Sequence, residues 1–298
     1  MLENIDCGTL FALFSLTDKG KMMQTGYYSA AAGMVTQFNR LDTIANNLAN
    51  VNTAGFKQDN LIVGDFMRIY QEKRDELDLQ NNTKESAKFL NRTLTRAPQI
   101  VDAYTDYSVG SMQKSSNTLD FAIAREGLFF AVKTPQGVRL TRDGSFTTND
   151  EGTLVTKEGY PVLPSDYFTA NKPDNFIRMN PEDTIIAVDK NGQMATNIPN
   201  SAKLIQGSKL MIAQPDNIKL LKKEGDNLYA FVDKKSINVL ENSDAVRQGF
   251  VEKSNVNAVQ MMTELIQTNR LVGMYQKAMT TQMDDMNNDA INKLARKA

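Results

Sequence analysis

The sequence contains no histidine and no tryptophan, and Cys7 is its only cysteine. Without histidine, the common nucleophile–histidine triads, histidine-ligated metal sites and imidazole acid–base catalysis are excluded. A single cysteine forms neither an internal disulfide nor a cysteine-rich metal site. The nearest candidate for a membrane helix, Leu10–Leu16, is far shorter than the roughly 18–20 apolar residues that such a helix needs. It also lacks the flanks of a secretory signal. We expect no cofactor, no metal and no membrane insertion.

What is present is ordinary for a globular protein. The 298 residues are enough for a sizeable core and two domains. A formal charge of −1 and a pI of about 5.7 imply no large basic patch, which argues against nucleic acid or an anionic membrane as a partner. Apolar residues at 41% and charged residues at 23% are both typical.

Residues 25–51 have helical periodicity. Their apolar residues follow one another at alternating spacings of four and three, which is the pattern of a heptad seam. Gly55 is a plausible stop signal beyond the last of them. The predicted seam includes Met34, Phe38, Leu41 and Leu48, together with Tyr27, Ala31 and Ala45.

A second helix is predicted from about Asn257 to Arg296. Asn257 is a suitable N-cap, and Gln260 three residues later completes a capping-box pattern. Polar residues interrupt the seam of this helix at Thr268 and Gln282. The apolar seam residues are Met261, Leu265, Val272, Tyr275, Met279 and Met286. Because each seam is narrow, the two can cover each other in a coiled-coil-like pair.

Between residues 98 and 248 the pattern changes to short apolar runs broken by turn residues. Hairpins are predicted around Pro135–Gly137, Glu151–Gly152 and Asn191–Gly192, and "SKLMIAQ", Ser208–Gln214, predicts one further strand. Such a series favours an antiparallel β-rich domain. Residues 57–97 are polar and charged, and predict an extended connector with some helix.

The expected fold is therefore α+β, with long terminal helices that pair as a coiled-coil-like module around a central antiparallel β-rich domain. Met22 or Met23 is the expected true start, because residues 1–21 share little with the rest of the chain. The predicted divisions are an N-terminal extension (1–22), an N-terminal helix (23–56), a connector (57–97), the β-rich domain (98–248) and a C-terminal helix (249–298).

The end of the first helix is unusually rich in asparagine: Asn46, Asn47, Asn50 and Asn52. Asn46, Asn47 and Asn50 project away from the seam at 100° per residue. A solvated face would carry lysine and glutamate, whereas an uncharged ridge suits a helix that packs against copies of itself. The alternative is an ordinary polar surface at a fraying helix end.

Four blocks of sequence resemble the bacterial flagellar rod and hook family. They are "YYSAAAGMVTQFNRLDTIANNLANVNTAGFK" (Tyr27–Lys57), "SSNTLDFAIAREGLFFAVKTPQGVRLTRDGSFTTNDEGTLVTKEGYPVL" (Ser115–Leu163), "EGDNLY" (Glu224–Tyr229) and "SNVNAVQMMTELIQTNR" (Ser254–Arg270). The first block ends in the family's ANNLANxNTxGFK pattern. Ser116 and Leu128 depart from the usual residues and blur which member this is.

The resemblance implies a structural subunit of the flagellar basal-body rod. Such proteins are exported without a cleaved signal by the flagellar type III apparatus. They polymerise helically in the periplasm with copies of themselves and with other rod and hook proteins, forming the drive shaft that transmits torque from motor to hook. The short central region favours a rod protein over a related hook-family subunit. A non-flagellar coiled-coil adaptor that forms closed oligomers is a further alternative.

An enzyme is the rival class. Carboxylates are plentiful, including Asp143, Asp150, Asp284, Asp285 and Asp289, but spacing alone says nothing about convergence, and exposed acidic residues are the usual explanation. "DKNG", Asp189–Gly192, lacks the rest of a calcium-binding loop and is better interpreted as a hairpin turn. We expect no catalytic, cofactor-binding or metal-binding residues.

Overall fold

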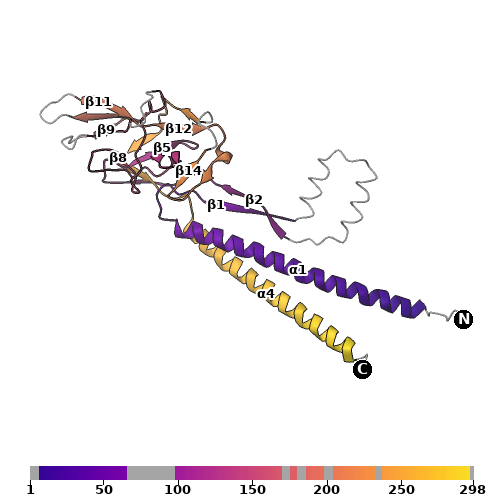
Figure 1. The fold of residues 1–298 in the computed structure, drawn as a ribbon. Coiled ribbons are helices and arrows are strands. Elements are labelled where there is room, and N and C mark those ends of the chain that lie inside the picture. The colour runs from indigo at the N-terminus through magenta and orange to yellow at the C-terminus, as the bar shows by residue number, and fades with distance from the viewer. Residues whose placement is uncertain are drawn as a thin grey trace, which may run out of the picture. The chain divides into compact units, whose positions relative to one another are not determined.

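The computed structural model describes residues 7–65, 98–169, 175–179, 186–197, 204–231 and 237–295 (Figure 1). The chain divides into two compact units. The helical unit comprises Met1–Asn46, Asn60–Tyr104 and Val259–Ala298. The β unit comprises Asn47–Asp59 and Thr105–Ala258.

Both terminal segments are helical, as the sequence predicted. Helix α1 spans Cys7–Ala49 and helix α4 spans Ala258–Ala295. The start of α1 differs from the prediction, because the helix begins at Cys7 rather than near residue 25. No proline occurs in α1 to interrupt its hydrogen bonds, so it continues through the predicted boundary at residue 22. In the part of the chain that is described, no helix is both long and apolar enough to cross a membrane.

Within the helical unit, α1 and α4 contact each other, as three pairs of described residues show. Arg40 lies 3.7 Å from Glu264 in an ion pair. A Cβ atom on Gly33 would lie 2.5 Å from the ring of Tyr275, and one on Gly26 would lie 2.3 Å from the amide of Gln282. Residue numbers fall along α1 as they rise along α4, so the two helices run antiparallel, side by side (Figure 1).

A two-stranded sheet joins β1, Asp59–Asp65, to β2, Pro98–Thr105. Strand β1 lies at the start of the predicted connector, residues 57–97, and this part of the connector is extended. The rest of that connector, residues 66–97, lies outside the described residues.

The β unit is built on a six-stranded antiparallel sheet in the order β13-β14-β6-β5-β12-β15. Alternate residues of β5 face two different apolar clusters: Phe130 and Val132 in one, Phe129 and Ala131 in the other. Both faces of the sheet are therefore covered. The strands are β5 (Phe129–Thr134), β6 (Gly137–Thr141), β12 (Ile212–Pro215), β13 (Lys222–Lys223), β14 (Leu228–Ala230) and β15 (Ile237–Val239).

The smaller sheets are β11-β10-β9, β16-β4, β17-β3 and β7-β8. The three predicted hairpins are confirmed by the antiparallel pairs β5–β6, β7–β8 and β9–β10. The bounds are β3 (Met112–Lys114), β4 (Phe121–Ile123), β7 (Thr147–Thr148), β8 (Leu154–Val155), β9 (Ile186–Val188), β10 (Gln193–Asn197), β11 (Leu204–Lys209), β16 (Val246–Gln248) and β17 (Phe250–Glu252), with a 3-10 turn, η2, at Ile218–Leu220.

One strand prediction was wrong. The segment "SKLMIAQ" is divided between β11, which ends at Lys209, and β12, which begins at Ile212. The two residues between them are buried in different clusters, Leu210 in one and Met211 in the other. The chain leaves one sheet and enters another at this point, which a continuous apolar run does not reveal.

Candidate functional site

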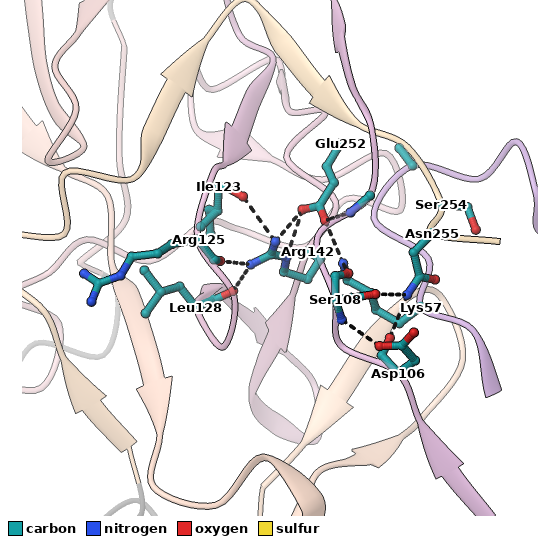
Figure 2. Close-up of polar contacts among 12 residues, drawn as sticks. Lys57, Asp106, Ser108, Ile123, Arg125, Leu128, Arg142, Glu252, Ser254 and Asn255 are labelled. Carbon is teal, nitrogen blue, oxygen red and sulfur yellow. Dashed lines mark hydrogen bonds and ion pairs between the residues drawn. The ribbon is translucent and has the colours of Figure 1, made fainter. Parts of the chain in front are cut away.

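Three buried charges from distant parts of the sequence meet inside the β unit. Lys57 is the last residue of "NTAGFK", Arg142 lies in "TRDGSF", and Glu252 ends β17. The Lys57 Nζ atom lies 2.6 Å from Glu252 Oε1, and the Arg142 Nε and Nη2 atoms lie 2.9 and 2.7 Å from Glu252 Oε2 (Figure 2). We call these three residues the buried triad.

The triad is fully enclosed, with side-chain exposures of 0% for Lys57 and Glu252 and 1% for Arg142. Buried charges are tolerated only when paired and hydrogen-bonded. Arg142 also donates to the backbone carbonyls of Ile123, Arg125 and Leu128, and the Glu252 carboxylate also accepts from the Gly110 amide. The Arg142 guanidinium thus bonds the end of β4 and the segment that follows it to the residue directly after β6.

Lys57 is a member of the triad with a shifted pKa. Burial lowers the pKa of Lys57 below its ordinary value of 10.5, and the nearby Arg142 charge lowers it further. Its pairing with Glu252 acts in the opposite direction and raises the pKa. One carboxylate serves two cations, so Lys57 also donates to the backbone carbonyl of Ser108 at 2.5 Å.

Gly55 allows the loop of residues 52–57, "NTAGFK", to approach Arg142 and Glu252. We call residues 52–57 the motif loop. The φ of Gly55 is +69°, a left-handed conformation that favours glycine, and a Cβ atom there would lie 2.4 Å from the backbone nitrogen of Asp143. Its amide donates to the backbone carbonyl of Glu252 at 2.8 Å. The glycine of "NTAGFK" is therefore required both for the turn and for the close approach to "TRDGSF".

Asn255 adds a second set of bonds beside the triad. Its Oδ1 accepts from the backbone amide of Gln58 at 2.8 Å, and its Nδ2 donates to the backbone carbonyl of Asp106 at 2.9 Å (Figure 2). The segment just before α4 is therefore bonded to the segment that follows α1.

Lys223 braces the other side of the motif loop. Its Nζ donates to the Lys57 carbonyl at 2.7 Å and to Asp59 Oδ2 at 2.8 Å, and it lies 4.0 Å from the centre of the Phe56 ring. Burial lowers the pKa of Lys223, while its bond to Asp59 raises it. Asn227, in "EGDNLY", also contacts the motif loop. Its side-chain Nδ2 donates to the backbone carbonyl of Ala54 at 2.8 Å.

The predicted asparagine ridge is divided. Asn46 and Asn52 are exposed, and Asn50 is half-buried and accepts a bond from the Thr53 hydroxyl. Asn47 is 1% exposed, and its amide brackets the backbone of Asp59, donating to the carbonyl at 2.7 Å and accepting from the amide at 3.0 Å. Asn47 closes the turn after α1 within its own chain, so it is not part of the proposed intersubunit ridge.

The buried face of α1 is displaced by one residue, or about 100°, from the predicted seam. Met34, Leu41 and Leu48 are half-buried, and Phe38 is 43% exposed. The reason is that small residues on the neighbouring face allow close approach, as at the Gly33 contact with Tyr275. The buried residues of that face are Ala30, Gly33, Thr36, Gln37, Ile44 and Asn47.

In α4, the predicted seam coincides with the less exposed face. Met261 and Val272 are buried, and Leu265, Tyr275 and Met279 are half-buried. The polar interruptions lie on the same face, with Thr268 buried and Gln282 half-buried. How these residues pack in an assembled rod stays a prediction.

The triad was not predicted from the sequence, although each of its three residues lies in or next to one of the four family-like blocks. The available signal was a charged residue close to apolar residues and glycine, as in "GFK" and "LTRDG". Among the residues that the structure describes, no group of three or more Cys, His, Asp or Glu residues could hold a metal ion. What the arrangement does is cross-link chain segments.

Two long helices, together with a β unit whose own chain segments are cross-linked by buried charges, are typical of a structural protein that assembles. Three family models match: flagella basal body rod protein over residues 28–57, flagellar hook protein FlgE/F/G D1 domain over 122–203, and flagellar basal body rod FlgEFG protein C-terminal over 247–293. The chain belongs to the FlgE/F/G family of flagellar rod and hook proteins and is a basal-body rod subunit of the FlgF/FlgG type.

Individual relatives agree over most of the chain. The flagellar basal-body rod protein FlgG of Agrobacterium fabrum is 31% identical over 258 residues, which cover 85% of this chain and 93% of the relative. FlgF of Caulobacter vibrioides is 32% identical over 248 residues, covering 83% and 89%. FlgG of Borreliella burgdorferi is 29% identical over 265 residues, covering 87% and 95%. The chain is thus a structural component of the flagellum at the basal body, with a role in motility.

Proposed function

We propose that this subunit polymerises helically through α1 and α4 to form the periplasmic drive shaft between motor and hook. In this proposal the two helices pair as a coiled-coil-like module, and the chain itself catalyses no reaction. Its partners are copies of itself and other rod and hook proteins. It reaches the periplasm through the flagellar type III export apparatus, without a cleaved signal.

The observation that carries the proposal is the apolar surface that the helices leave exposed. On α1, Tyr28 is 68% exposed, Val35 58% and Phe38 43%. These residues recur at spacings of seven and three, so they form one stripe along the helix. On α4, Val259, Met262 and Ile266 form a similar stripe, with exposures of 75%, 52% and 53%.

Burying one such side chain contributes about 1.5–3 kcal/mol. A contiguous exposed apolar stripe therefore favours association. Copies of the same chain are suitable partners because both stripes are free of charge at these positions. The exposed amides of Asn46 and Asn52 lie near the end of α1, where we propose that they contribute polar contacts between subunits.

The test is Phe38→Asp, expressed in a strain that lacks the native subunit. A charge on the α1 stripe should abolish rods, counted as complete basal bodies by electron microscopy, while the isolated chain stays folded. Phe168→Asp is the matched control, because Phe168 is 37% exposed in the β unit. Rods in normal number with Phe38→Asp would contradict the proposal. A single closed oligomer of the wild type by sedimentation would favour an adaptor instead.

A further inference from the structure

The chain passes between its helical unit and its β unit four times, at 46/47, 59/60, 104/105 and 258/259. Each passage is a covalent link. Force that passes through the backbone from one unit to the other must therefore pass through these four points. The four links move together if the β-unit residues next to the passages are bonded to one another. They move separately if those residues are not bonded.

On the β side, the passages are bonded to one another. Asn47, which follows the first passage, brackets the backbone of Asp59, which precedes the second. The Thr105 hydroxyl, which follows the third passage, donates to Asp59 Oδ1 at 2.7 Å, and the amide of Asp106 donates to the Gln58 carbonyl at 2.8 Å.

The fourth passage joins the same set through Asn255, three residues before Ala258. Asn255 accepts from the Gln58 amide and donates to the Asp106 carbonyl. All of these residues belong to the β unit, and together they hold the four passages in one network. We call Asn47, Gln58, Asp59, Asp106 and Asn255 the hub.

The buried triad connects the hub to the β-sheet. Lys57 precedes Gln58, Glu252 lies three residues before Asn255, and Arg142 follows β6 of the six-stranded sheet directly. The Glu252 carboxylate contacts all three parts, because it binds Lys57, Arg142 and the amide of Gly110. Removing its charge would leave two buried cations without a counter-ion.

We infer that the hub, held by Glu252, is a mechanical coupler that makes the four chain passages respond to force as one body. Its role in rotation rests on the proposed function as a drive-shaft subunit. The coupling itself is a property of the single chain. Hydrogen bonds suit this role because their strength depends on distance and angle, so that displacement of one bonded segment against another weakens them.

The first test is amide hydrogen exchange on the full chain, comparing wild type with Glu252→Gln. Exchange at the Gly55, Gln58, Asp106 and Gly110 amides should accelerate together, by about tenfold or more, because the hub opens as a local cooperative unit. Two amides bonded within the sheet region, those of Lys133 and Leu163, should be unaffected.

Glu224→Gln is the matched control, because Glu224 pairs with Arg139 at 2.6 Å but is 44% exposed. It should change none of these amides. Acceleration at Gly110 alone would overturn the inference, since only the direct partner of the carboxylate would then depend on it. Equal acceleration at Lys133 and Leu163 would also overturn it, because the carboxylate would then support global stability only.

Asn255→Ala provides the test if Glu252→Gln does not fold, because it removes hub bonds without stranding a buried charge. The Gln58 and Asp106 amides should again accelerate together with Gly55. Acceleration at Gln58 alone, the one amide that Asn255 accepts from, would overturn the inference.

The second test is rotation against load, in cells that carry large beads on their filaments. Glu252→Gln motors should stop or break at high load more often than wild-type and Glu224→Gln motors, at equal numbers of complete basal bodies. Equal performance at high load would overturn the coupling role. Absence of rods in the wild-type strain would overturn the proposed function alone, because the exchange measurement needs no rod.

Discussion

In the β unit, the six-stranded sheet carries apolar clusters on both faces, and its buried charges are paired with one another and with backbone carbonyls. In the helical unit, α1 and α4 contact each other along one face and leave apolar stripes on the other. The difference separates two kinds of stability. The β unit closes its interior with its own residues, whereas the helical unit presents surface that further subunits can cover.

The largest expected effect lies in the triad and tests whether the β unit is self-sufficient. Arg142→Met keeps an unbranched apolar stem but removes the guanidinium, which is a partner of Glu252 and the donor to three carbonyls. Breaking a buried pair in this way should lower the free energy of unfolding by about 3–5 kcal/mol. Denaturant unfolding followed by near-ultraviolet circular dichroism measures this, because the packed tyrosines of the β unit report on its core.

Arg139→Met is the control, because Arg139 lies on β6, three residues before Arg142. Arg139 pairs with Glu224, which is 44% exposed, and such a surface pair contributes only about 0–1 kcal/mol. Equal effects of the two substitutions would show that the triad is not the buried element that distinguishes the β unit.

A smaller effect follows from the lowered pKa of Lys57. In the folded chain Lys57 releases its proton below the ordinary value of 10.5, whereas the unfolded chain holds it until about that value. Between these two values the unfolded state binds more protons, so the free energy of unfolding rises with pH. Lys57→Met lacks this contribution.

The measurement is the free energy of unfolding of both proteins from neutral pH upwards. The difference between wild type and Lys57→Met should shift in favour of the wild type as pH rises towards 10.5. Subtracting one protein from the other cancels the titration of groups that they share. A flat or falling difference would mean that burial does not penalise the charged lysine in the folded state.

Local patterns predicted much of this fold. The β5–β6 hairpin is specified by turn residues around Pro135–Gly137 between two short apolar runs, and both terminal helices follow from periodicity. These features depend on residues close together in the sequence. The break between β11 and β12 was missed because a buried run looks the same whether it continues in one sheet or crosses to another.

The candidate site could not be predicted in the same way. Lys57, Arg142 and Glu252 are each separated by many residues, and only the tertiary fold brings them together. The buried face of α1 was misplaced for a related reason. The prediction chose Met34 and Phe38 because they are large and apolar, but the partner helix comes close where Gly26 and Gly33 have no side chain. The buried face of α1 therefore contains the small residue Gly33, whereas the larger Phe38 is exposed.

The smallest effect concerns an exception within the β unit. Tyr229 is 0% exposed and packs against Tyr107 and Phe129, with ring centres 5.7 and 5.5 Å away. Its hydroxyl has no hydrogen-bond partner among the described residues. An unsatisfied buried hydroxyl costs about 1–3 kcal/mol, so Tyr229→Phe should leave stability unchanged or raise it by about 1 kcal/mol.

Tyr107→Phe is the comparison, because Tyr107 packs in the same aromatic cluster but has a side-chain hydrogen bond with Thr105. Removing that hydroxyl should cost about 0.5–1.5 kcal/mol, so the two substitutions should differ in sign. Both are measured by the midpoint of denaturant unfolding at constant slope. A clear loss of stability in Tyr229→Phe would mean that the Tyr229 hydroxyl is satisfied, and the β unit would then have no exception to its closed interior at this position.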